Sequence, residues 1–158
     1  MRRQSGCAAR AEAFAGAVQP LAHPYTICGT VVHGQHLGRT VGMPTANLDA
    51  DISALALPCG VYATLTRLGG ALYPGVTNVG RRPSVDSSPI ITVETHLLDF
   101  SRDIYGETLH TEVRGYIRPV HKFAGLAEVR AQVQKDIALA REFFVRFAAE
   151  LASQIRGA

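Results

Sequence analysis

The chain has 158 residues, 47% of them hydrophobic and 18% charged, with a formal net charge of +3. This length predicts one domain with a sizeable core, and the composition is that of an ordinary globular protein. No stretch reaches the ~18 apolar residues of a membrane span, and no basic run interleaved with aromatic residues indicates a nucleic-acid site.

Residues 1–22 are predicted to form an N-terminal tail with a short helix or linker, and residues 23–158 to form the folded domain. Ala11 to Leu21 is rich in alanine, which favours a helix that Pro20 ends. The first ten residues lack the apolar core of a secretory signal but are rich in Arg and Ala. A transit peptide is therefore an alternative to a plain tail.

Strand patterns recur along the middle of the chain, at Tyr25 to His33, Val61 to Leu68, Ala71 to Val76, Ile91 to Leu98 and Leu109 to Ile117. Gly69-Gly70 is a two-residue hairpin signal. Asn78 to Pro89 is predicted to be a mobile loop, and Ser101 to Glu107 to join its flanking strands as an antiparallel pair. Alternation predicts one face with Leu109, Thr111, Val113 and Ile117, and another with His110, Glu112, Arg114, Tyr116 and Arg118. Several short strands with turn signals predict a small closed or nearly closed barrel.

The hydrophobic period changes at Leu126. Apolar residues then recur at spacings of three and four, at Leu126, Val129, Val133, Ile137, Ala140, Phe144, Phe147 and Leu151. This spacing predicts an amphipathic helix of about two dozen residues that packs its apolar stripe on the barrel wall.

A candidate phosphate-binding segment comes after the first strand, from Gly34 to Leu48. Its three glycines allow close backbone approach to an anion, and Arg39 adds donors suited to phosphate. Thr45 and Asn47 supply hard oxygen ligands of the kind Mg²⁺ accepts. The segment fits neither the Walker P-loop nor Gly-x-Gly-x-x-Gly. The alternative is a surface loop whose glycines serve turns.

The run Gly29-x-Val-Val-x-Gly34-x-x-x-Gly38-Arg39-x-x-Gly42-x-Pro44-Thr45-Ala46-Asn47 resembles the signature of the riboflavin kinase (flavokinase) family. Further matches occur in the same order: Pro58-x-Gly60-Val61-Tyr62, Gly75-Val76-x-Asn78-x-Gly80-x-Arg82-Pro83, Glu94-x-His96-Leu97-Leu98-Asp99-Phe100, Tyr105-Gly106, and Ile117-Arg118-Pro119 with Lys122-Phe123. The similarity runs from about Pro24 to Arg141.

This resemblance implies a mainly β fold, a six-stranded antiparallel Greek-key barrel with a long C-terminal α-helix. The implied activity is transfer of the γ-phosphoryl group of ATP to the 5′-hydroxyl of riboflavin, which gives FMN and ADP. In bifunctional flavin synthetases an adenylyltransferase domain precedes a similar kinase module. We expect the kinase here without that domain.

The resemblance also assigns site residues. It implies ATP binding by Gly34, Gly38, Arg39, Gly42, Thr45 and Asn47, with Mg²⁺ held by Thr45 and Asn47. It marks Glu94 as the catalytic base, and Glu94 lies on the more polar face of its predicted strand. The alternative for Glu94 is a solvated strand glutamate.

The segment from Ile117 to Phe123 matches a flap near the flavin, so Arg118 and Phe123 are candidate flavin contacts. The alternative is that Arg118 pairs with a surface acid and Phe123 anchors the start of the helix. The family often carries an acidic residue after Arg-Pro, where this chain has Val120, which puts the local flap contacts in doubt.

We therefore expect an enzyme whose partners are riboflavin and ATP, with no nucleic acid and no membrane, as a monomer. Cys7, Cys28 and Cys59 form no disulfide or zinc pattern, which favours free thiols in a reducing cytoplasm. Two alternatives are a non-catalytic flavin or nucleotide module on the same barrel and a small-barrel nucleic-acid binder. The presence of Thr45, Asn47 and Glu94 together argues against the first, and the lack of a basic groove pattern against the second.

Overall fold

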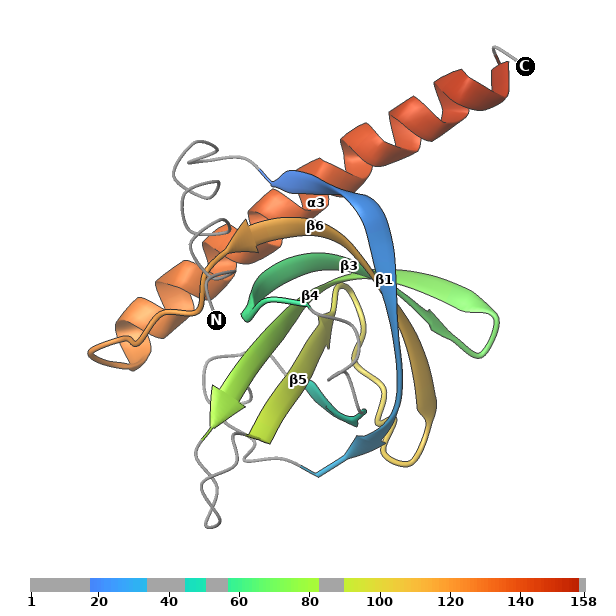
Figure 1. Ribbon diagram of the computed structural model, residues 1–158. Helices are drawn as coiled ribbons and strands as arrows, with labels where there is room; N and C mark the ends of the chain where they lie inside the picture. Colours follow the sequence, from blue (N-terminus) through green and yellow to red (C-terminus); the bar gives the residue numbers. More distant parts are fainter. Residues whose placement is uncertain (1–17, 34–44, 51–56, 83–89, 157–158) are drawn as a thin grey trace.

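The computed structural model describes residues 18–33, 45–50, 57–82 and 90–156, which form six strands and one long helix. The elements are β1 (Gln19–Val32), β2 (Ala46–Asp49), β3 (Gly60–Leu68), β4 (Ala71–Arg82), β5 (Ile90–Leu97), β6 (Thr108–Arg118) and α3 (Leu126–Arg156). The strands close into a barrel in the order β1-β2-β5-β4-β3-β6, with every neighbouring pair antiparallel (Figure 1). Strands β3, β4 and β5 are consecutive neighbours and β6 returns beside β3, which is a Greek key. The predicted fold class is confirmed.

The core fills the barrel because alternate strand residues point inward. Ile27, Tyr62, Leu109 and Val113 are at most 1% exposed and belong to one apolar cluster. Tyr62 and Tyr116 meet edge to face inside it, with ring centroids 5.5 Å apart. Burying these side chains stabilises the barrel by about 1.5–3 kcal/mol for each large residue.

Five buried threonines add a polar component to this core. The hydroxyl of Thr77 lies 2.9 Å from that of Thr64 on β3 and 2.9 Å from that of Thr95 on β5. A second pair joins Thr66 to Thr111 at 2.9 Å. All five side chains are fully buried. Threonine suits strands, and its hydroxyl here is satisfied by a neighbour on the next strand.

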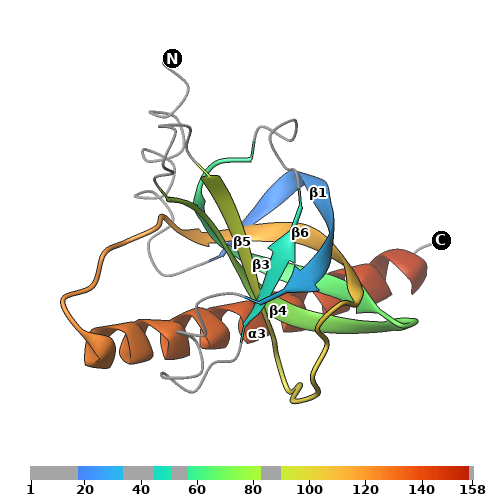
Figure 2. The same cartoon turned by 90° about the horizontal axis from the view of Figure 1, so that it is seen from below.

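The helix α3 covers one outer side of the barrel (Figure 2). Val61, Ala63 and Val76 face outward from β3 and β4 and pack with Ala140 of α3 in a second apolar cluster. The first turn is fixed by Glu128, whose carboxylate accepts a hydrogen bond from the Ala124 backbone N–H at 3.2 Å. The helix has 31 residues, more than the two dozen predicted, and extends beyond the barrel (Figure 1).

Local signals predicted the β3–β4 hairpin correctly. Gly69 and Gly70 have φ values of 57° and 86°, as a tight hairpin turn requires. On α3, Val133 and Ala140 of the predicted stripe are buried, whereas Leu126 is 55% exposed and lies outside the packed stripe. No helix among the described residues is long and apolar enough to span a membrane.

Two predictions near strand ends were wrong. Gln19 to Leu21 forms the start of β1 rather than the end of a helix, because Gln19 and Pro20 pair with Tyr116 and Gly115 of β6. The rest of that predicted helix lies outside the described residues. Asn78 to Arg82 continues β4 rather than opening a loop, since it pairs with Ile90 to Glu94 of β5. Residues 83–89 are not described.

The prediction that β5 and β6 pair was also wrong, because β5 lies between β2 and β4 and β6 lies between β1 and β3. Within β6 the predicted alternation fails after Val113. The pairing with β3 shifts at Arg114 and again at Ile117, so Tyr116 enters the barrel core and Ile117 packs toward α3. Each extra residue in a bulge reverses the facing of the residues after it, and simple alternation does not reveal it.

Candidate active site

A row of side chains crosses five strands of the barrel at one level. Asn47 of β2 pairs with Glu94 of β5, and Glu94 pairs with Asn78 of β4. Asn78 pairs with Val61 of β3, and Val61 pairs with Arg118 of β6. Residues directly opposite each other on antiparallel strands have Cβ atoms about 4.5–5.5 Å apart. The fold thus places a predicted metal ligand beside the predicted base, with a predicted flavin contact at the far end of the row.

This row lies on the outer face of the barrel. The residues next in sequence, Leu48, Val79 and Val93, are buried in the core cluster. Successive strand residues point to opposite faces, so Asn47, Glu94 and Asn78 project outward. Glu94 is half-buried, between the barrel surface and solvent. The predicted two-faced pattern of β5, with Glu94 on the more polar side, is confirmed.

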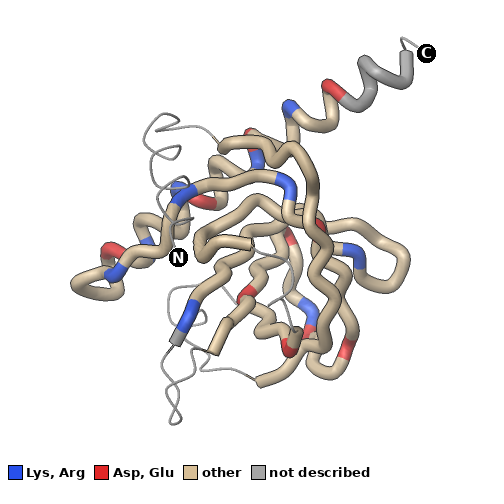
Figure 3. The backbone as a smooth tube through the Cα atoms, viewed as in Figure 1, with Lys and Arg blue, Asp and Glu red and all other residues tan. Residues whose placement is uncertain are grey.

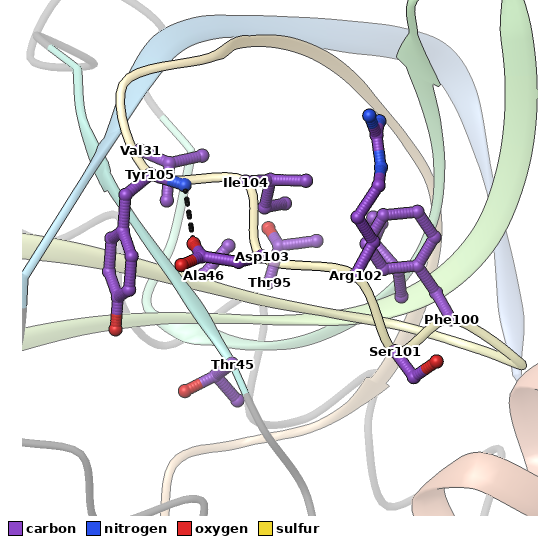
Figure 4. A pocket seen from close by; sticks show the side chains of 11 residues that line it. Val31, Thr45, Ala46, Thr95, Phe100, Ser101, Arg102, Asp103, Ile104 and Tyr105 are labelled. Atoms are coloured by element: carbon purple, nitrogen blue, oxygen red, sulfur yellow. Dashed lines mark hydrogen bonds between the residues drawn. The ribbon is translucent and has the colours of Figure 1, made fainter.

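Thr45 precedes β2 and lines a cavity of about 440 Å³ at the mouth of the barrel. The loop after β5 forms much of its wall, including Asp103 and Tyr105, as Figure 4 shows. The Tyr105 backbone N–H donates to the Asp103 carboxylate at 3.1 Å, which shapes that loop. The Tyr105 ring stacks on His33 with centroids 3.8 Å apart. Thr45 therefore connects this cavity with the segment that carries Asn47.

Arg118 is engaged with the helix. Its Nε and Nη2 donate to the carboxylate of Asp136 at 2.9 Å, and its Nη1 donates to the Pro119 carbonyl at 3.1 Å. The Asp136 side chain is only 4% exposed, and Gln132 donates to it as well. The guanidinium also lies over the Phe123 ring, 5.6 Å from its centroid. This network holds residues 119–123 between β6 and α3.

A second ion pair ties the end of β5 to α3. Arg141 donates to both carboxylate oxygens of Asp99 at 2.8 and 2.9 Å. The hydrogen bond and charge of Arg141 lower the pKa of Asp99 below its ordinary value. Asp99 has a φ of 56°, a left-handed conformation that marks the sharp turn after the strand.

The structure locates some predicted site residues and leaves others undetermined. Gly34, Gly38, Arg39 and Gly42 lie outside the described residues. Asn78 belongs to the family-like sequence pattern without a predicted role, yet it stands next to Glu94. Its Oδ1 is buried and has no hydrogen-bond partner among the described residues. A buried acceptor without a hydrogen-bond partner is unusual in a native protein and calls for an explanation. No sequence pattern placed Asn78 beside Glu94; this neighbourhood follows from the register between β4 and β5.

The donor set fits a hard divalent cation. Thr45 and Asn47, two residues apart at the start of β2, offer a hydroxyl and an amide oxygen. Mg²⁺ prefers oxygen ligands and is bound by few protein groups together with substrate phosphates. These residues can therefore hold Mg²⁺ alongside a nucleotide.

Comparison with known proteins gives the family. A family model described as riboflavin kinase matches residues 21–144. The bifunctional riboflavin kinase/FMN adenylyltransferase of Escherichia coli K12 is 45% identical over 127 residues, which are 78% of this chain and 39% of the relative. The RNA-binding riboflavin kinase RibR of Bacillus subtilis is 42% identical over 118 residues, 75% of this chain and 50% of the relative. This chain thus spans half or less of either protein.

Among solved structures, the riboflavin kinase of Trypanosoma brucei is similar with a TM-score of 0.54 and 25% identity, covering 76% of this chain and 79% of that one. The family match includes every strand from β2 to β6 and the row from Asn47 to Arg118. By sequence and by fold, this chain belongs to the riboflavin kinase family.

Proposed function

We propose that this chain is an ATP:riboflavin 5′-phosphotransferase that produces FMN and ADP. The observation that carries the proposal is the pairing of Asn47 with Glu94 across β2 and β5. It brings Asn47, the proposed ligand of the metal–nucleotide complex, next to Glu94, the proposed acceptor of the alcohol proton. Phosphoryl transfer needs little else: phosphates held, charge neutralised and the nucleophile oriented in line.

In this proposal Glu94 is the general base. It accepts the proton of the riboflavin 5′-hydroxyl, whose oxygen attacks the γ-phosphorus while the bond to the β–γ bridging oxygen breaks. Thr45 and Asn47 would hold Mg²⁺, which would neutralise negative charge at the phosphates. A base must lie within hydrogen-bond reach of the proton it takes, and in this proposal the half-buried Glu94 accepts that proton where the substrate meets the outer face of β5.

The cavity at the barrel mouth is the proposed place for the nucleoside part of ATP. Its volume of about 440 Å³ is in the range of small-molecule sites. Thr45 lines it, so a nucleotide seated there would extend its phosphates toward β2. The segment with Gly34, Gly38, Arg39 and Gly42 precedes Thr45 in the sequence, and we propose that these residues bind the phosphates.

The flavin ring is proposed to lie near the segment between β6 and α3. Because the Arg118 guanidinium is hydrogen-bonded to Asp136, we propose that Arg118 holds this segment in place rather than binding the flavin itself. The Phe123 ring is the proposed aromatic contact of the flavin. The protein is proposed to act as a monomer in the cytoplasm, with Cys28 and Cys59 as free thiols.

The test is incubation of the purified protein with riboflavin, ATP and Mg²⁺ and identification of the product by chromatography. Formation of FMN supports the proposal, and tight flavin binding without FMN would indicate the non-catalytic module instead. For the nucleic-acid alternative, Figure 3 shows the Lys and Arg positions of the described residues interspersed with Asp and Glu positions along the backbone. Filter binding with single-stranded nucleic acid at two salt concentrations tests it directly.

A further inference from the structure

The outer face of β4 and β5 carries a glycine beside Glu94, a position here called the Gly80 notch, that the proposed mechanism does not use. Gly80 pairs with Thr92, two residues along the ladder from the pairing of Asn78 with Glu94 and on the same face of the sheet. A Cβ at Gly80 would lie 3.2 Å from the Thr92 hydroxyl and 3.7 Å from the Asn78 Oδ1. Because Gly80 has no side chain, the Thr92 hydroxyl and the Asn78 amide oxygen border its backbone directly, next to the proposed base.

The chemistry of the walls selects the ligand. The Asn78 Oδ1 is a buried acceptor without a partner among the described residues, and the carboxylate of Glu94 is also an acceptor. A phosphate brings only more acceptors and negative charge, so it does not suit this notch. A ligand hydroxyl suits it, because it donates one hydrogen bond and accepts another.

The spacing between β5 and β4 indicates which part of the substrate lies beside Asn78. Neighbouring strands lie about 4.7–4.9 Å apart, so Asn78 is one strand spacing from Glu94 on the side away from Asn47. A substrate whose terminal hydroxyl meets Glu94, with its phosphate donor on the Asn47 side, extends its next carbons toward Asn78. In riboflavin those carbons carry the remaining hydroxyls of the ribityl chain.

We propose that the Gly80 notch binds the internal hydroxyls of the ribityl chain, with the Asn78 Oδ1 accepting a hydrogen bond from one of them. This inference rests on the proposed function and adds a specificity-determining residue to it. Asn78 selects a polyol side chain on the flavin over an apolar one of equal length. A site built to hydrogen-bond a substrate hydroxyl discriminates strongly against the analogue that lacks it.

The experiment compares riboflavin with a flavin carrying a 5-hydroxypentyl chain, which keeps the terminal hydroxyl and lacks the internal ones. Wild-type protein should prefer riboflavin in kcat/KM. Asn78→Ala should lower kcat/KM for riboflavin by at least about fivefold, the value of one good hydrogen bond, and change the analogue by less than about twofold. Gly80→Ala fills the notch and should act in the same direction. Gln134→Ala removes an exposed amide on α3 and serves as the matched control.

Three results would overturn the inference: an unchanged preference in both variants, an equal loss on both flavins, or a loss that added Mg²⁺ restores. The last would assign Asn78 to the metal. If the wild-type protein forms no FMN, the phosphotransferase proposal fails. Binding of the two flavins, monitored by flavin fluorescence, then tests the notch alone. Equal affinity of wild-type protein for both would refute the notch, whereas a preference that Asn78→Ala removes would support it. Gly80→Ala gives the same information should Asn78→Ala not fold.

Discussion

The threonine chain inside the barrel gives a quantitative test of the core. Thr77→Val keeps the side-chain shape but removes the central hydroxyl, so two hydrogen bonds of 2.9 Å are lost at once. Each intramolecular hydrogen bond contributes about 1 kcal/mol net. The hydroxyls of Thr64 and Thr95 remain fully buried and lose that partner. We expect the free energy of unfolding to fall by about 2 kcal/mol.

Thr64→Val is the matched comparison, because Thr64 stands at the end of this hydroxyl chain and shares a hydrogen bond with Thr77, whereas Thr77 bonds on both sides. The change should cost about half as much, about 1 kcal/mol. In urea, with a slope of about 2 kcal/mol/M, Thr77→Val should shift the midpoint by about 1 M and Thr64→Val by about 0.5 M, with the slope unchanged.

The pair Thr66 and Thr111 supplies an internal check, because each has the other as partner. Changing either threonine alone to valine leaves the other buried hydroxyl without a hydrogen-bond partner and should lower the free energy of unfolding. The double change removes both hydroxyls and should leave the free energy of unfolding nearly unchanged. If Thr77→Val proves no more destabilising than Thr64→Val, the buried hydroxyls are not an interacting chain and the reasoning fails.

Three further outcomes are expected. Glu94→Gln should lower kcat by about 10²–10⁴-fold with little change in flavin or ATP binding, and a folded variant within about threefold of wild type would remove Glu94 from the role of base. Thr45→Val should reduce FMN formation most strongly at limiting Mg²⁺, with partial recovery at higher Mg²⁺; equal activity at limiting Mg²⁺ would exclude Thr45 as a ligand. Because the pKa of Asp99 is lowered by Arg141, their pairing stabilises the folded protein above the pKa of Asp99 in the unfolded chain and ceases to do so as pH falls through its folded pKa. The difference in unfolding free energy between wild type and Arg141→Gln should therefore shrink in acid, and a difference that stays constant down to about pH 2 would contradict this.

The parts of the fold that sequence predicts well are local. Gly69-Gly70 specifies its hairpin through two left-handed residues, and the stripe with Val133 and Ala140 specifies a helix through its period. The facing of Val93 and Thr95 results from alternation alone. These features depend on neighbours within a few residues, so their signals are complete in the sequence.

The site depends on pairings that no local pattern contains. That Asn47 meets Glu94, and Glu94 meets Asn78, results from the strand order β2-β5-β4, which separates β5 from its sequence neighbour β6. The partner of Arg118 is Asp136, and the sequence offered no reason to choose a buried acid over a surface one. Resemblance to a family assigned predicted roles to Glu94 and Asn47 but gave none to Asn78.

Closure of the barrel has a consequence for how the chain folds during synthesis. β1 is synthesised before the other strands but forms its longest ladder with β6, the last of them. Residues 19–30 therefore cannot complete this ladder until residues 108–116 have been synthesised. Pairings of such long sequence separation are slow to form. Until β6 leaves the ribosome, β1 and β3 each keep an open edge, and Val61, Ala63 and Val76 lack the helix that covers them. A nascent chain that stalls before residue 118 therefore exposes strand edges and apolar surface together, and it is at this stage of synthesis that we expect the protein to depend on chaperones.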